Sequence, residues 1–338
     1  MTKGKTMPRF AVLAAALLAS SAPGAGTPRS LPVGTCINMG NQLEAQSETA
    51  HGGAAITAAD FKRIRAAGFT TVRIPVRWSD KTGDAPDYRI DPAWMARVTT
   101  VVDQALAAHL NVILNDHHFD ALDADPAANS AKLAAIWTQV AAHFADRPTA
   151  RLWFEIENEP HEKFDRSNLM ATLSPALAAI RASNPKRAVI IGGENWSGID
   201  SLATLDLPDD PNVYPTFHYY EPFDFTHQGA TWVKPRPPAL GRTYGTAADA
   251  QRLVADTGKI KAYIARTGVI PFMGESGAYE KYIPLEQRVQ YTRAVHDAFT
   301  PLGVGICQWA YTNTFPLYDH TAKRWLPGMR GALGLAEK

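Results

Sequence analysis

The segment that most constrains the fold of this chain is residues 151–160, with the sequence RLWFEIENEP. Every second position is apolar, namely Leu152, Phe154 and Ile156. The positions between them hold an aromatic residue and two carboxylates, namely Trp153, Glu155 and Glu157. This alternation is typical of a strand that packs one face against helices and points the other face inward. Pro160 ends the run because proline has no N–H for a sheet ladder and restricts the residue before it.

The end of this strand carries the first candidate for catalysis. Glu159 lies at the carboxyl end, where parallel α/β folds place their chemistry. Asn158 beside it offers an amide that can orient a substrate hydroxyl. Taken alone, the segment leaves open that Glu159 is an ordinary solvated loop carboxylate.

The rest of the chain repeats a strand–helix pattern. Eight strand segments are centred near residues 36, 72, 112, 152, 189, 214, 270 and 304. Helices are expected at 57–67, 91–108, 130–145, 168–183, 246–266 and 285–299. Apolar strands that alternate with helices indicate a parallel sheet buried on both faces. Eight such units predict a single-domain α/β fold, a (β/α)8 TIM barrel over 30–338. A doubly wound sheet is the alternative, but no Gly-rich phosphate loop follows a strand.

The balance of charged residues limits the kinds of molecule that this chain is expected to bind. The chain has 34 Lys and Arg against 33 Asp and Glu, a formal charge of +1, so it shows no basic excess for binding nucleic acid. A neutral substrate is therefore expected, and neither nucleic acid nor membrane is an expected partner.

The first 25 residues have the three parts of a secretory signal. Positive residues at 3, 5 and 9 precede an apolar run at 10–19, and small residues follow to position 25. The apolar run is too short to cross a bilayer, which takes about 20 residues. We therefore expect an exported protein, secreted or periplasmic, whose catalytic domain occupies 30–338.

The only cysteines are Cys36 and Cys307. They fall in the first and last predicted strands, which are neighbours in a closed barrel, and export makes a disulfide possible. Bridging adjacent parallel strands demands tight geometry. The sequence therefore favours two buried thiols over a disulfide.

Polar or aromatic side chains occur at the end of every predicted strand. In chain order they are Asn41, Arg73, His117 and His118, Asn158 and Glu159, Trp196, His218 and Tyr220, Glu275, and Trp309. Glu159 and Glu275 follow the fourth and seventh strands and can face each other across the barrel mouth. Two carboxylates that flank a bond, one protonated and one ionised, are the apparatus of glycosidic hydrolysis.

Tryptophans offer flat apolar platforms to sugar rings, although each is as readily a core residue. The candidates are Trp78, Trp196, Trp232, Trp309 and Trp325. Trp196 and Trp309 are preferred because they stand at strand ends.

Metal catalysis is not expected. His117 and His118 follow Asp116, but adjacent residues at a strand end point apart and no third ligand is evident. We therefore expect neither a metal nor a cofactor.

Several of these segments resemble glycoside hydrolase family 5, the cellulase family, over nearly the whole mature chain. The matching segments are INMGNQLE, VRIPVRW, ILNDHH, FEIENEP, FHYYEPFDFTHQG, FMGES and CQWAYTNTFPLYD. The resemblance implies a retaining endo-β-1,4-glucanase, with Glu159 as acid/base and Glu275 as nucleophile. Its substrate would be a β-glucan polysaccharide or oligosaccharide, and we expect a monomer. Mannan, xyloglucan, mixed-linkage glucan and β-1,3-glucan remain alternative substrates, and a non-catalytic carbohydrate-binding barrel is the alternative of another class.

The resemblance also suggests supporting roles. Arg73 is expected near Glu275, where its charge keeps the carboxylate ionised, although it can equally be a structural ion-pair partner. Tyr220 would donate to the same carboxylate, and His218 would adjust Glu159.

Substrate contacts are expected from three further residues. Asn158 would bind the sugar 2-hydroxyl, His117 a neighbouring hydroxyl, and Trp309 would form the floor of the cleaved subsite. His118 is expected to pack behind them rather than reach the substrate.

One residue departs from the family pattern. Glu157 stands where the family more often has an apolar or aromatic side chain. Because an unpaired buried charge is too costly, we expect Glu157 to be paired with an Arg or His, or protonated.

Overall fold

The barrel predicted from the strand pattern is present. The computed structural model describes residues 1, 27–50 and 54–337, so the predicted secretory signal, apart from Met1, lies outside the described residues. Eight parallel strands close in the order β10-β2-β3-β4-β5-β6-β7-β9. They are β2 (Thr35–Asn38), β3 (Thr71–Ile74), β4 (Asn111–Asn115), β5 (Leu152–Glu155), β6 (Val189–Gly192), β7 (Val213–His218), β9 (Phe272–Glu275) and β10 (Ile306–Gln308). The (β/α)8 fold is therefore confirmed.

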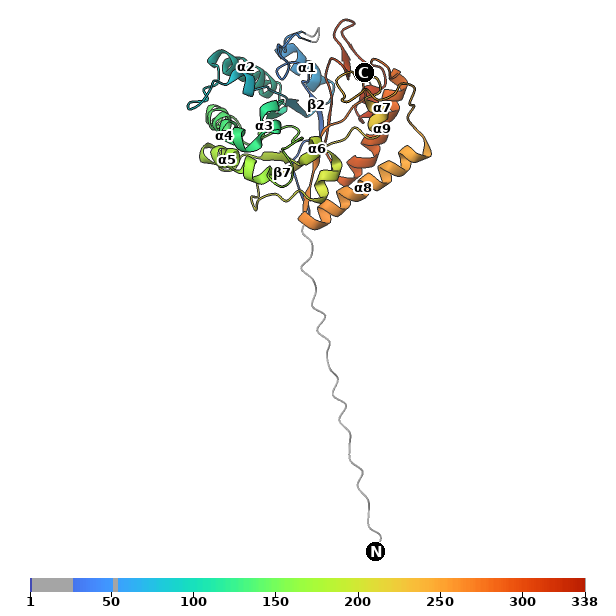
Figure 1. Ribbon diagram of the computed structural model, residues 1–338. Coiled ribbons are helices and arrows are strands. Elements are labelled where there is room, and N and C mark those ends of the chain that lie inside the picture. Colours follow the sequence, from blue (N-terminus) through green and yellow to red (C-terminus); the bar gives the residue numbers. More distant parts are fainter. Residues whose placement is uncertain (2–26, 51–53, 338) are drawn as a thin grey trace.

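Helices surround the barrel (Figure 1). The long ones are α1 (Ala58–Ala66), α2 (Pro92–Ala107), α4 (Pro126–His143), α5 (Leu169–Ser183), α8 (Ala247–Thr267) and α9 (Leu285–Phe299). All six were predicted within a few residues. Shorter elements in the loops are η1 (Ser79–Lys81), α3 (Asp120–Ala124), α6 (Glu194–Ser197), η2 (Ile199–Ala203), α7 (Phe223–Thr226), η3 (Thr300–Leu302) and α10 (Met329–Ala332). Among the described residues, no helix has both the length and the apolar character needed to cross a membrane.

Local capping explains why the helix bounds could be predicted. The backbone N–H of Thr57 donates to Asp60 at 2.9 Å at the start of α1. Asp91 accepts from the N–H of Ala93 at 2.8 Å before α2, whose first residue is Pro92. These signals lie within three residues of each helix end, so the sequence displays them directly.

The seventh strand is shorter than expected. Val269–Ile270 forms β8, which pairs with β1 (Arg29–Ser30) outside the barrel, and the barrel strand begins only at Phe272. Pro271 stands between the two, and its missing N–H interrupts a ladder. A second small sheet joins β11 (Tyr318–Asp319) to β12 (Arg324–Trp325).

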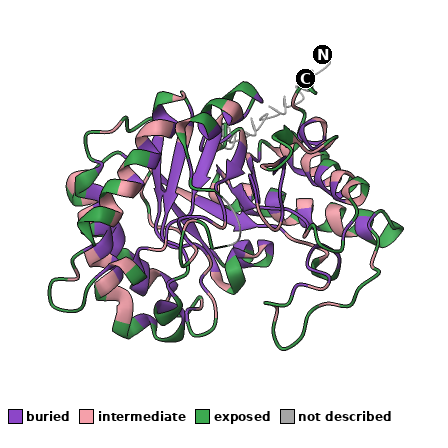
Figure 2. Ribbon diagram, turned by 90° about the horizontal axis from the view of Figure 1, so that it is seen from above, coloured by how far each residue is buried: buried purple, intermediate pink, exposed green. Residues whose placement is uncertain are grey.

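The core has two layers, as the alternation in β5 predicted. Leu152, Phe154 and Ile156 belong to the large cluster between barrel and helices, whereas Trp153 belongs to a smaller cluster inside the barrel. Figure 2 shows the barrel strands buried over almost their whole length, whereas the helices carry both buried and exposed residues. The side chains on the inward face of the strands therefore fill the barrel, and those at the carboxyl ends of the strands form the site at its mouth.

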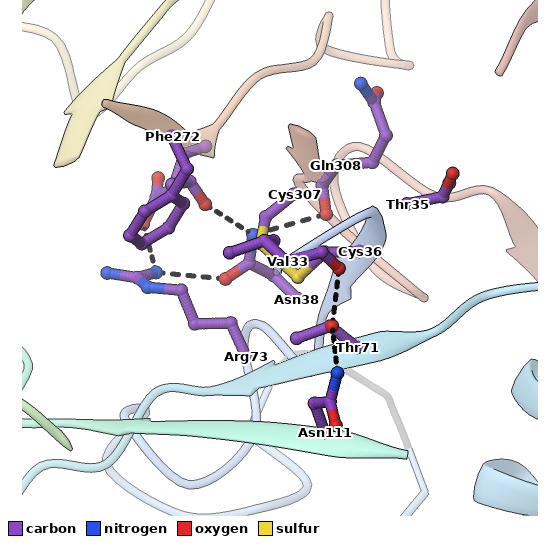
Figure 3. The surroundings of a disulfide bond; sticks show 12 residues. Val33, Thr35, Cys36, Asn38, Thr71, Arg73, Asn111, Phe272, Cys307 and Gln308 are labelled. Carbon is purple, nitrogen blue, oxygen red and sulfur yellow. Dashed lines mark hydrogen bonds and ion pairs between the residues drawn. A yellow bond between two sulfur atoms is a disulfide. The ribbon is translucent and has the colours of Figure 1, made fainter. Parts of the chain in front are cut away.

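The two cysteines form a disulfide, so the expectation of two free thiols was wrong (Figure 3). Cys36 and Cys307 are direct partners in the β2–β10 ladder, and their Cα atoms lie 4.1 Å apart. Both side chains point into the barrel, where this pairing brings the sulfur atoms together. The bond joins the first and last barrel strands across 271 residues of sequence.

Candidate active site

Two carboxylates and a histidine meet at the carboxyl ends of the barrel strands. Glu159 follows β5, His218 ends β7, and Glu275 ends β9. One carboxylate oxygen of Glu159, one of Glu275 and a ring nitrogen of His218 all lie within 4.8 Å of one another. The side chain of Glu275 is 6% exposed and that of Glu159 is 24% exposed, so a substrate can reach Glu159. The sequence predicted this encounter from strand order alone.

Arg73, at the end of β3, connects most of the site. Its Nη1 donates to Glu275 at 2.8 Å and to Asn38 at 2.9 Å, and its Nη2 donates to Asn158 at 2.5 Å. Its Nε and Nη2 also donate to the two oxygens of Glu155, at 2.7 and 2.9 Å. The expected ion pair between Arg73 and Glu275 is present. The structural ion pair that was also considered for Arg73 is present too, with Glu155 as its partner. Burial opposes the charge on Arg73, but Glu155 and Glu275 outweigh burial and raise its pKa above the ordinary value.

Both facing carboxyl groups have raised pKa values. Burial raises the pKa of Glu159 to about 7, against the opposing effect of Arg73. Burial also raises the pKa of Glu275, while the largest opposing effect comes from His218. From the sequence we expected the negative charge of Glu275 to keep Glu159 protonated. In the structure, burial is the main cause of the raised pKa of Glu159.

His218 and Tyr220 each hold one of the two carboxylates. His218 Nδ1 lies 2.6 Å from Glu159 Oε1 and 3.7 Å from Glu275 Oε2. Burial lowers the pKa of His218 to about 4, so the ring is neutral near pH 7. The Tyr220 hydroxyl donates to Glu275 Oε2 at 2.8 Å. Both contacts agree with the expected geometry.

Trp309 and His117 form an aromatic wall beside Glu275. Their rings stack with centroids 5.7 Å apart and an interplanar angle of 11°. The backbone N–H of Trp309 donates to the carbonyl of Ser276, the residue after Glu275, at 2.8 Å. A Cβ at Gly40 would lie 2.7 Å from the Trp309 ring, so only glycine leaves room for this indole. His117 is 3% exposed, and burial lowers its pKa well below the ordinary value.

Two other predicted site residues lie at the rim. His118 is exposed and contacts the ring of His117 edge-on, with centroids 4.3 Å apart. Asn41 donates from its side chain to Thr314 at 2.9 Å, and its backbone N–H donates to Glu44. Asn41 therefore ties together the loops that follow β2 and β10.

The tryptophans divide into rim and core. Trp196 is 54% exposed and Trp232 is 48% exposed, so both remain available as platforms. Trp78 is fully buried and donates its indole N–H to the carbonyl of Asn115. Trp325 stacks on the buried Phe69 ring with centroids 5.5 Å apart. Trp78 is therefore a core residue, one of the two roles considered for it, whereas Trp325 is half-buried and packs against the core.

Sequence reasoning missed two buried carboxylates. The alternation in β5 predicted that Glu155 points inward, but it was not recognised as the partner of Arg73. Its position two residues after the inward-pointing Trp153 was the signal that could have identified it. Glu44 accepts from the N–H of Gln42 at 3.0 Å, and burial raises its pKa to about 7. Nothing in the spacing of Glu44 identified it, because it stands in a loop.

The surroundings of Glu157 favour the protonated form over the ion-paired form, the two alternatives predicted for it. It is 3% exposed, and its Oε1 accepts from the N–H of Asn158 at 3.0 Å. Burial and the neighbouring Asp116 and Asp123 raise its pKa well above the ordinary value. Within the described residues, no Arg or His forms an ion pair with Glu157.

The cluster of Glu159, His218 and Glu275 has the proximity of a three-ligand metal site. The guanidinium of Arg73, 2.8 Å from Glu275, already provides a positive charge there. Each of the three side chains also has a protein hydrogen-bond partner. These side chains therefore suit acid–base and nucleophilic chemistry by the carboxyl groups better than they suit the binding of a dication.

TIM barrels carry their active sites at the carboxyl ends of the strands, and glycoside hydrolases use two close carboxylates there. The model of the family described as cellulase (glycosyl hydrolase family 5) matches residues 36–314, and the chain belongs to this family.

Individual relatives agree with this assignment. The chain is 35% identical over 294 residues, or 86% of its length, to endoglucanase H of Acetivibrio thermocellus. It is similar to the structure of an endoglucanase from the hyperthermophilic Thermotoga maritima, with a TM-score of 0.85, 36% identity, and coverage of 89% of this chain and 97% of that one. The chain spans only about a third of the length of the first curated relatives it matches, 31% and 37%.

Proposed function

We propose that this protein is a retaining endo-β-1,4-glucanase in which Glu275 is the nucleophile and Glu159 the general acid/base. The observation that carries this proposal is the approach of their carboxylate oxygens to within 4.8 Å. Retaining enzymes hold the two carboxyl groups about 5–5.5 Å apart, whereas inverting enzymes need about 6.5–9.5 Å to admit a water.

In the first step, Glu275 attacks the anomeric carbon as the bond to the leaving sugar breaks. Glu159 gives its proton to the leaving oxygen, and a pKa of about 7 lets it hold that proton near neutral pH. The hydrogen bonds from Tyr220 and Arg73, both 2.8 Å long, aim the two oxygens of Glu275.

In the second step, the same two residues exchange tasks. The ester formed on Glu275 carries no charge, so Glu159 can remain ionised and accept a proton from water. The water then attacks the anomeric carbon and releases Glu275. His218, neutral near pH 7 and 2.6 Å from Glu159, keeps this carboxyl group in place through both steps.

Asn158, His117 and Trp309 are the proposed contacts to the sugar under attack. The Oδ1 atom of Asn158 accepts from Arg73, so the amide presents Nδ2 as its donor, beside the Glu159 carboxyl group, for the sugar 2-hydroxyl. Trp309 lies beside Glu275 and offers its ring as the floor for that sugar.

Relatives named as endoglucanases, one of them a hyperthermophilic endo-β-1,4-glucanase, support a β-1,4-glucan as the substrate. Structures of the Thermotoga maritima enzyme are described with cellobiose and with mannotriose, and a relative from Bacteroides ovatus is named as xyloglucan-specific. A panel of β-glycans with reducing-end detection is the decisive test. Fastest release from cellulosic glucan is expected. Fastest release from mannan, xyloglucan, mixed-linkage glucan or β-1,3-glucan would replace the substrate but keep the mechanism.

Two results would overturn the chemistry itself. NMR should detect the β-anomer as the first product, and an initial α-anomer would identify an inverting enzyme. Binding of β-glycans without any hydrolysis would support the carbohydrate-binding alternative.

We also propose that the protein is exported and acts as a monomer. The charged, apolar and small-residue segments of positions 3–25 support export. Fractionation of expressing cells tests this proposal, and retention of the full-length chain in the cytoplasm would contradict it.

A further inference from the structure

His161, directly after the Asn-Glu-Pro segment, joins two parts of the site through its ring. Its Nδ1 lies 2.6 Å from the backbone carbonyl of Glu159. A carbonyl oxygen only accepts, so Nδ1 carries a proton and donates it. The buried carboxylate of Asp123, at the end of α3, lies 3.4 Å from the same nitrogen and accepts from the His161 backbone N–H at 3.2 Å. The ring is thus held on its polar edge by α3 and the Glu159 backbone.

The imidazole ring of His161 stacks against the indole ring of Trp196. The two rings stack with centroids 4.9 Å apart and an interplanar angle of 21°. The backbone continues the connection, because Trp196 N–H donates to the carbonyl of Pro160 at 3.1 Å and the Ser197 hydroxyl donates to that of Asn158 at 2.9 Å. The loop after β6 is thereby attached to the segment that holds Glu159.

The two proposed indole platforms, the exposed Trp196 and the buried Trp309, lie next to different carboxylates along the chain. The backbone N–H of Trp309 donates to Ser276, the residue after Glu275, whereas the backbone N–H of Trp196 donates to Pro160, the residue after Glu159. The nucleophile stands beside the sugar it attacks, and the acid stands beside the leaving oxygen. The Trp196 ring, which stacks on His161 beside the acid, is suited to the sugar on the leaving-group side.

We propose that His161 is a positioning residue for both the acid Glu159 and the sugar platform Trp196. Its Nδ1–H fixes the backbone of the acid Glu159, and its ring supports Trp196 as the platform for the leaving-group sugar. The inference rests on the proposed function, because it assigns His161 a role in that same reaction.

Two substitutions separate the two contacts. His161→Phe keeps a flat ring beneath Trp196 but cannot donate to Glu159, and His161→Asn keeps a donor near Nδ1 but removes the ring. Each is assayed with a cello-oligosaccharide and with dinitrophenyl β-cellobioside. The aryl substrate has no leaving-group sugar, and its leaving group departs without a proton.

The two variants should fail in different ways on the oligosaccharide. His161→Asn should raise KM about threefold to tenfold, the effect of one lost aromatic contact, with kcat nearly unchanged. His161→Phe should lower kcat about tenfold with little change in KM, because removing one neutral hydrogen bond leaves Glu159 misplaced. Both should keep the wild-type rate of glycosyl–enzyme formation on the aryl substrate.

His296→Asn is the matched control. His296 is also partly exposed and also contacts an aspartate, Asp297 at 3.1 Å, but it lies on α9 and lines a cavity with Gly34 and Gly305, which precede their strands. Equal losses by the His161 variants on both substrates, or no loss on either, would overturn the proposal. A wild-type protein that hydrolyses neither substrate would instead refute the proposed function, so the two failures are distinguishable.

Discussion

Arg73 holds Glu155 by two hydrogen bonds, from Nε to Oε2 over 2.7 Å and from Nη2 to Oε1 over 2.9 Å. Both side chains are completely shielded from solvent. This fork fixes the guanidinium inside the barrel, and its remaining N–H groups then reach Glu275, Asn158 and Asn38. A structural ion pair thus orients the residues proposed for catalysis.

Replacing Arg73 with Met should destabilise the protein strongly, because Glu155 and Glu275 would lose their buried counter-ion. Removal of one partner from a buried ion pair costs about 3–5 kcal/mol. Urea unfolding measures the free energy of unfolding. Arg236→Met, at an exposed position, is the control and should change it by less than about 0.5 kcal/mol. Similar stability of the two variants would contradict the importance of the Arg73–Glu155 pair.

Substitutions of Glu159 and of Glu275 should reduce activity in ways that depend differently on the leaving group of the substrate. Glu159→Gln should slow glucan hydrolysis about 10²–10⁴-fold but spare glycosyl–enzyme formation from dinitrophenyl β-cellobioside, which needs no acid. Glu275→Gln should abolish activity on both substrates, because no nucleophile remains. The comparison uses initial rates and pre-steady-state bursts. Identical profiles for the two variants would refute the division of roles.

The activity on glucan should fall in alkaline solution. Burial raises the pKa of Glu159 to about 7, so the protonated form needed in the first step is lost as the pH rises above about 7. The pH profile of kcat/KM measures this effect. The dinitrophenyl substrate should show no such alkaline decline, and a shared decline would assign it to another group.

Protein stability should decrease between about pH 4 and pH 8 because of Asp116. Burial raises its pKa to about 8, whereas an aspartate in the unfolded chain titrates near about 3.9. The folded state therefore binds more protons in this range, and stability present at low pH is lost as the pH rises, by up to about 1.4 kcal/mol per pH unit. Urea midpoints of Asp116→Asn should vary less with pH than those of the wild type. Asp87→Asn, at an exposed position, should retain the wild-type slope.

The disulfide should contribute to stability without contributing to catalysis. Removing it by substituting both Cys36 and Cys307 with Ser should lower the free energy of unfolding by about 2–5 kcal/mol, because the unfolded chain loses a cross-link. Activity at 25 °C should stay near that of the wild type. Thiol titration of the denatured, unreduced wild type should find no free thiol. Two reactive thiols would contradict the bond.

Sequence patterns determined the barrel because their signals are local. The period-two alternation of Leu152, Phe154 and Ile156 predicted which face of β5 meets the helices, and caps such as Thr57 and Asp91 predicted where helices begin. Each signal depends on residues only a few positions apart. Strand order then sufficed to predict that Glu159 and Glu275 converge, since parallel strands end on the same side of a barrel.

Only the tertiary structure decided how side chains from different strands pair. The Arg73–Glu155 fork joins residues 82 positions apart, and the disulfide joins residues 271 apart. The protonated Glu157, the buried Trp78 and the stack of His161 on Trp196 likewise depend on neighbours brought in by other elements. The physical reason is that burial, inter-strand register and local charge arise only when the barrel closes, and no single segment contains them.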